Sequence, residues 1–129
     1  MPNGFHGPKD AWERMEAPLR AVDDRLQVFA ERNGFLVRRN YHNTPERSLL
    51  WAEGGVEKLI QLFLADENAL TFNVWICASQ DRKGQRYWKR QFLRERVALD
   101  GIDSQLESLL EEGRMALSGW HEDDLERAG

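Results

Sequence analysis

The nine residues 70–78, LTFNVWICA, decide the fold that we predict for this chain of 129 residues. Apolar and polar side chains alternate along them, so that one side holds Leu70, Phe72, Val74 and Ile76 and the other holds Thr71, Asn73, Trp75 and Cys77. A period of two is typical of a strand with one face in a hydrophobic core. We therefore expect a sheet whose two faces differ.

Four further stretches are predicted to be strands, namely residues 35–42, 47–53, 56–65 and 86–99. Residues typical of turns separate them, including the pair Gly54-Gly55, which suits a two-residue hairpin loop. The connections are too short to hold crossover helices, so neighbouring strands must run antiparallel. The sequence therefore predicts a five-stranded antiparallel sheet arranged as a meander.

Helices are predicted before and after the strands. Apolar residues recur at alternating spacings of three and four from Trp12 to Phe29, which indicates one helical stripe with Pro18 inside it and Asn33-Gly34 as its stop. Residues 104–107 have the form of a capping box at the start of a second, leucine-rich helix. We expect both helices on one face of the sheet, which gives an α+β fold of order α-β-β-β-β-β-α.

Length and composition indicate one domain. A chain with 41% hydrophobic and 31% charged residues is ordinary for a globular protein. Residues 10–120 are expected to form a single α+β domain, with 1–9 and 121–129 as flexible tails. One cysteine, Cys77, allows no internal disulfide, and no stretch has the form of a signal peptide or a membrane span. These features predict a cytoplasmic protein without membrane contact.

Residues 82–96, RKGQRYWKRQFLRER, hold seven basic residues and one acid in a chain of net charge −4. If this stretch is a strand, its even positions place cations and rings alternately on one face, with Arg86, Trp88, Arg90, Phe92 and Arg94 in that order. Such a face can bind an anionic or aromatic partner. It can also be a solvated face on which arginine stems cover the rings. A helix over 86–97 would scatter the set, and its many good helix formers leave that alternative open.

Trp75 and Phe63 are expected beside these residues on the face that the helices leave uncovered, together with Cys77 and, if the register allows, Trp51 and Tyr41. Aromatic residues and arginine are typical anchors of protein interfaces, and a patch of rings is larger than most monomers expose. The alternative is that the terminal helices wrap far enough to bury the rings. The predicted partner-binding residues are Arg86, Trp88, Arg90, Phe92, Arg94, Trp75 and Phe63.

No pattern of residues predicts catalysis, a cofactor or a metal. The three histidines, His6, His42 and His121, lack the spacing of metal ligands. Gly54-Gly55 does not match a phosphate-binding loop, and nothing local marks a Cys77–His42 pair as a nucleophile and its base. We therefore expect a protein that is not an enzyme and that has no cofactor or metal site.

The leading hypothesis is a protein-interaction module of the small chaperone, adaptor or immunity type. It would bind a protein partner, or a second copy of itself, through the uncovered sheet face. The first alternative is a module for single-stranded nucleic acid that uses the basic strand 86–96. The second alternative is a small-molecule binder or enzyme with a pocket between the sheet and the helices.

Overall fold

The structure, a computed structural model, describes residues 9–41, 44–65, 71–98 and 102–127 of the chain. These residues form the elements α1 (Lys9–Arg20), α2 (Asp23–Asn33), β1 (Leu36–Tyr41), β2 (Thr44–Glu53), β3 (Val56–Leu64), β4 (Thr71–Arg82), β5 (Gln85–Ala98), α3 (Ile102–Ser118), a 3₁₀ turn (Glu122–Asp124) and β6 (Glu126–Arg127). All strands belong to one antiparallel sheet in the order β1-β2-β3-β4-β5-β6. The predicted α+β meander is confirmed, with six strands where five were predicted.

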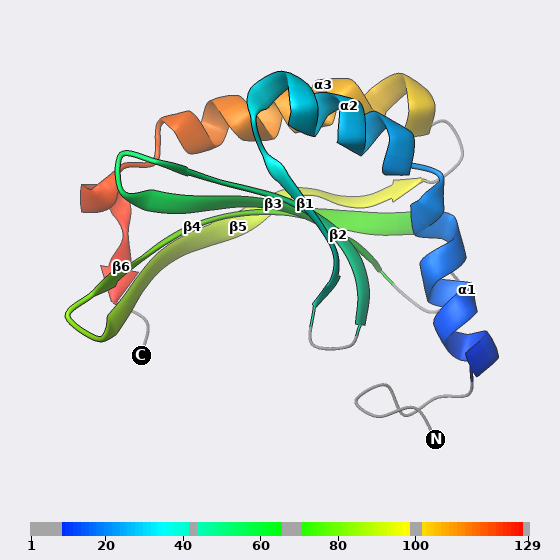
Figure 1. The fold of residues 1–129 in the computed structure, drawn as a ribbon, viewed down its shortest axis with the longest axis horizontal. Helices are drawn as coiled ribbons and strands as arrows, with labels where there is room; N and C mark the ends of the chain where they lie inside the picture. The colour runs from blue at the N-terminus through cyan, green and yellow to red at the C-terminus, as the bar shows by residue number, and fades with distance from the viewer. Residues whose placement is uncertain (1–8, 42–43, 66–70, 99–101, 128–129) are drawn as a thin grey trace.

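The helices α2 and α3 lie side by side across one face of the sheet, and α1 lies beside β2 at one end of the sheet (Figure 1). The core fills the space between these helices and the sheet. On β4, Phe72, Val74 and Ile76 of the predicted apolar side are buried, as is Ala78, and they share one core with Leu106 and Leu110 of α3. Leu70, the first residue of that side, lies outside the described residues. The alternation in 71–78 therefore identifies the covered face of the sheet correctly. No described helix has both the length and the apolar character needed to cross a membrane.

The N-terminal apolar stripe is divided between two helices. Pro18 lies in the last turn of α1, where it cannot donate a main-chain hydrogen bond. The first two N–H groups after α1 bond three residues back, Ala21 to Pro18 at 3.3 Å and Val22 to Leu19 at 3.1 Å, which tightens the chain where α1 ends. The chain then starts α2, which stops at Gly34 with φ 74°. The break turns α1 down along the sheet, toward β2 (Figure 1).

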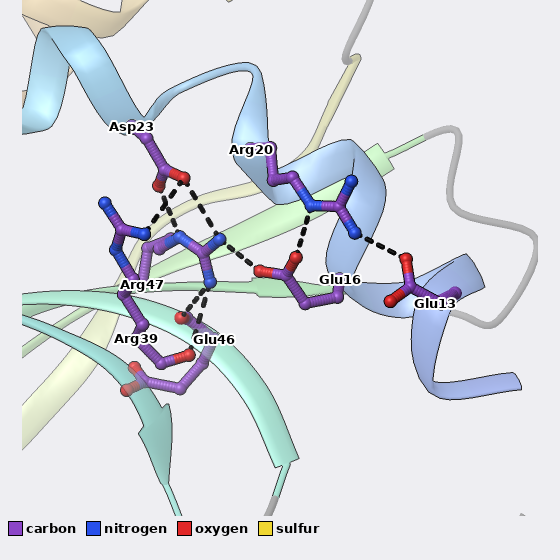
Figure 2. A network of polar contacts seen from close by, with 7 residues as sticks. All are labelled: Glu13, Glu16, Arg20, Asp23, Arg39, Glu46 and Arg47. Carbon is purple, nitrogen blue, oxygen red and sulfur yellow. Dashed lines mark hydrogen bonds and ion pairs between the residues drawn. The ribbon is translucent and has the colours of Figure 1, made fainter. Parts of the chain in front are cut away.

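A fully buried arginine, Arg47 of β2, ties both N-terminal helices to the sheet (Figure 2). Its Nε and Nη2 donate to the carboxylate of Asp23 at the start of α2, and Nη2 also donates to Glu16 of α1. Its Nη1 donates to the main-chain carbonyls of Arg39 at 3.2 Å and Glu46 at 3.0 Å. Two carboxylates and two carbonyls thus surround one cation, the kind of pairing that a buried charge requires.

This network makes stability depend on pH. Partial burial opposes ionisation of Glu16, but hydrogen bonds from Arg47 and Arg20 outweigh it, so the pKa of Glu16 lies below its ordinary value of 4.5. A carboxyl whose pKa is lower in the folded state adds stability above its unfolded pKa and loses it as the pH falls through the folded pKa. We expect the free energy of unfolding to decrease as the pH drops below about 4.5, and we expect Glu16→Gln to make this decrease smaller.

Urea unfolding at neutral pH and at about one unit below pH 4.5 measures this difference. Glu31→Gln, which changes an exposed carboxylate of α2, is the control. An equal loss of stability on acidification in Glu16→Gln and in the unchanged protein would contradict the assignment.

The segment after α3 extends the sheet. Residues 121–129 are predicted to be a flexible tail, whereas Glu126 and Arg127 pair with Trp88 and Tyr87 of β5. Buried Trp120 and Leu125 hold this segment in place, and Lys89 lies 4.5 Å from the ring of Trp120. A pairing of two residues is too short to leave a period in the sequence, so the sixth strand was missed. Residues 128–129 and the predicted tail up to residue 8 lie outside the described residues.

Candidate binding site on the open face of the sheet

The face opposite α2 and α3 is here called the open face. The register places Leu50, Leu59, Cys77 and Arg90 in one row across β2, β3, β4 and β5. Side chains of directly paired residues lie on the same face, so this row crosses the open face. A hollow of about 1000 Å³ lies over it and is lined by residues of β1 to β5. No described helix covers this side of the sheet (Figure 1).

Five of the seven predicted residues come together on the open face as an aromatic cluster, defined as Phe63, Trp75, Trp88, Arg90 and Phe92. The rings of Trp75 and Phe92 stack at 3.8 Å between centroids, and Phe63 stacks on Trp75 at 6.3 Å. The guanidinium of Arg90 lies 4.4 Å from the Trp88 ring and 5.3 Å from the Trp75 ring. Trp88 and Phe92 are each 38% exposed. The predicted strand over 86–97 is therefore observed, and it brings these rings and this cation into contact.

Arg86 also lies on the open face, but acids of the same molecule neutralise it. Its Nη1 is 3.1 Å from both Glu57 and Asp81, and its Nη2 donates to Ser79 at 2.7 Å. For this residue the structure agrees with the solvated-face interpretation. Arg90 has no ion pair among the described residues, and its close contacts are with rings.

Arg94 does not lie on the open face, and its grouping with the even positions is wrong. Phe92 pairs with Trp75 while Arg94 pairs with the adjacent residue Val74, so Leu93 is the extra residue of a β-bulge. The bulge carries Arg94 to the side of the helices, where it donates to Glu112 of α3 at 2.7 Å. A count of positions along β5 cannot detect this shift because it assumes a regular strand.

Trp51 is not on the open face either. It pairs with Lys58, which is buried on the side of the helices, and its ring stacks on Phe35 at 3.9 Å. The side chain of Tyr41 lies outside the described residues. The open face thus holds fewer rings than the most permissive register would give it, and those it holds are concentrated on β3, β4 and β5.

A polar cluster that the sequence analysis missed forms the other end of the hollow. Glu46 is only 2% exposed although it lines the open face, and it accepts hydrogen bonds from Arg38 at 2.9 Å, from Ser48 and from Gln61 at 3.3 Å. Residue 46 lies between the predicted strands 35–42 and 47–53, in a stretch expected to be a turn, whereas β2 begins at Thr44. Among the described residues no buried side-chain nitrogen or oxygen lacks a partner, so this cluster is satisfied internally.

The thiol of Cys77, which lines the hollow, is not activated. Burial raises the pKa of the Cys77 thiol, and the nearby cations Arg90 and Arg86 offset this only in part. A thiol of raised pKa remains protonated at neutral pH and is a poor nucleophile. His42, the base considered for it, lies outside the described residues, within which no group of three acids, histidines or cysteines is placed to hold a metal.

The position of the basic stretch in the sheet explains much of its charge. β5 has 14 residues, but within the described part of the chain its outer edge pairs with β6 at Tyr87 and Trp88 alone. Unpaired edges invite pairing with other chains, and cations and bulges prevent it. β5 has both, since Arg90, Arg94 and Arg96 follow the paired part, the register shifts twice, and Arg96 has a φ of 54°. Edge protection is therefore a role for these cations that needs no ligand.

Comparison with family models, curated proteins and solved structures found no match to this chain.

Proposed function

We propose that the protein is an interaction module that binds a polypeptide partner in the hollow on its open face. The observation that carries this proposal is the aromatic cluster, in which Trp88 and Phe92 are each 38% exposed. Phe92 stacks on Trp75, and Trp88 contacts the guanidinium of Arg90. Exposed tryptophan and arginine in contact are typical of the residues that dominate protein binding energies. Their place on an uncovered sheet face gives a partner direct access to them.

The distribution of charge favours a protein partner over nucleic acid. Affinity for a polyanion grows with the number of phosphates that free cations neutralise. Of the seven basic residues in 82–96, Arg86 and Arg90 line the hollow, and Arg86 is already paired with Glu57 and Asp81. One available cation among rings suits a partner with a single carboxylate beside apolar groups. The large hollow also lies on the opposite side of the sheet from the pocket that a small-molecule binder was expected to have.

A photo-crosslinking amino acid tests this proposal. Placed at Phe92, it should give a discrete protein adduct in an extract of the native host, whereas placed at Met115, which is exposed on α3, it should give none. Excess unlabelled protein should prevent the adduct. Unlabelled Trp88→Ala protein should compete with the crosslinking protein about thirtyfold less well, because truncating an anchor residue costs about 2 kcal/mol of binding free energy.

Three outcomes count against the proposal. They are the absence of any protein adduct at position 92, an equal yield of adducts from positions 92 and 115, and an adduct that nuclease treatment removes. The last outcome would favour the nucleic-acid alternative.

A further inference from the structure

We infer that the hollow receives an amphipathic α-helix of another protein, with an acidic residue beside its apolar stripe. This inference rests on the proposed function and specifies the shape and chemistry of the partner. It follows from the main-chain hydrogen bonding of the open face, from the size of the hollow and from the side chains that line it. The apolar surface of the chain's own helices is the fourth observation.

The main chain of the middle strands of the floor is engaged in the sheet. β2, β3 and β4 are each paired on both sides, so their N–H and C=O groups bond to neighbouring strands. An extended peptide pressed onto this floor would lose water from its own backbone and find no main-chain partner. A helix bonds its backbone internally and needs none. Strand addition at the outer edge of β5 is opposed by the two register shifts there.

The size of the hollow suits a helix. A helix is a cylinder about 10 Å across, so about 1000 Å³ corresponds to a length of about 13 Å, or roughly two turns. Because the hollow is open on one side, a helix can rest in it with one face down and its other face in water. A helix of about four turns would then contact the face along much of its length.

The side chains of the hollow specify the face of that helix. Leu50, Leu59, Phe63 and Trp75 form an apolar lining, which matches an apolar stripe at positions i, i+3, i+4 and i+7. Arg90 lies at the β5 side of this lining without a carboxylate partner among the described residues. The carboxylate of Glu46, by contrast, is already bound by Arg38. An acidic residue flanking the apolar stripe would therefore meet Arg90.

The chain's own described helices do not offer such a stripe. The large apolar side chains exposed on them are Val28 of α2 and Met115 of α3, one on each helix. The other large exposed apolar residues, Leu36, Trp88 and Phe92, belong to β1 and β5. Among the described side chains, a second copy thus offers no apolar helix face to insert, which favours a helix from a different protein.

Synthetic peptides of about 16 residues, or four turns, test the inference with the full-length protein. The probe is a panel of helical peptides with one stripe of leucine, isoleucine or methionine flanked by glutamate. Fluorescence anisotropy should show binding of striped peptides and at least about tenfold weaker binding of two controls, one with the same residues scrambled around the helix and one with a central proline.

A charge exchange tests the acidic flank. Arg90→Glu should weaken the binding of glutamate-flanked peptides about tenfold, because attraction becomes repulsion, and it should strengthen the binding of lysine-flanked peptides, because repulsion becomes attraction. Lys83→Glu makes the same charge change in the β4–β5 turn, outside the lining of the hollow, and should leave both affinities unchanged.

The failures of the two proposals are distinguishable. Equal binding of the proline-containing or scrambled peptides overturns the helix and leaves protein binding intact. Absence of peptide binding while the adduct at position 92 persists also overturns the helix and leaves protein binding intact. Self-association in sedimentation velocity that Trp88→Ala abolishes would identify a second copy as the occupant and overturn the helix. Absence of both peptide binding and adduct overturns both proposals.

Discussion

Arg47→Met is expected to lower the free energy of unfolding by about 3–5 kcal/mol, the usual cost of removing one partner from a buried ion pair. Methionine fills a similar volume, so the loss comes from charge rather than from a cavity. Without the guanidinium, the carboxylates of Asp23 and Glu16 lose the cation that lies between them. The carbonyls of Arg39 and Glu46 also lose a donor. Urea unfolding at neutral pH measures the change.

Two further variants separate charge from packing in this network. Arg20→Met removes an exposed arginine that also binds Glu16, and it should change stability little because water replaces the lost contact. Adding Asp23→Asn and Glu16→Gln to Arg47→Met should recover much of the lost stability, since the two carboxylates that lose the buried cation are then neutral. No recovery in the triple variant would show that the arginine acts through packing alone.

Local periodicity was enough to predict the two faces of the sheet. In 71–78 one side is apolar without interruption, so a single strand identifies the covered face, and Trp75 is correctly placed on the other. The same reasoning placed Trp88, Arg90 and Phe92 beside it, because β5 is regular up to residue 92. Where the strand is regular, a period of two contains all the information that placement needs.

Periodicity failed where the backbone departs from a regular strand. The extra residue Leu93 exchanges the two faces of β5, so Arg94 meets α3 although Arg90 does not. A bulge adds one residue without a marker such as glycine or proline in this sequence. Register in that part of the sheet depends on contacts with the neighbouring elements β4 and α3, such as those of Arg94 with Val74 and Glu112, which a single strand's pattern does not contain.

Buried cations are the second feature that local patterns could not reveal. Arg47 and Lys58 occupy positions on the covered face, where apolar residues are the rule. Lys58 reaches Glu53 at 2.8 Å across the β2–β3 hairpin, a partner close in sequence. Arg47 depends on Glu16 and Asp23, which meet it only because the chain breaks between α1 and α2. Such a site depends on tertiary structure and is invisible to any short window of sequence.

Gly113→Leu should destabilise the protein by about 3 kcal/mol, the upper part of the usual range for overpacking a core. Gly113 lies where α3 packs against Ile60 of β3 and Leu93 of β5. A Cβ atom there would lie 3.1 Å from Cδ1 of Ile60 and 3.3 Å from Cδ2 of Leu93, so a leucine has no space without displacing the helix. The gain in helix propensity over glycine, about 1 kcal/mol, is too small to compensate.

The matched control is Gly119→Ala, since a Cβ at that position meets only the carbonyl of Ala116 at 3.5 Å and should be tolerated. Truncating the opposing side chain provides the decisive comparison. Leu93→Ala alone should be destabilising, yet in Gly113→Leu it should cost less than in the unchanged protein, because the new leucine can turn into the vacated space. Thermal or urea unfolding of the four proteins of this cycle gives the coupling free energy. Additive losses would mean that α3 is not held against β3 and β5 at this point, and the packing that leaves the opposite face uncovered would need revision.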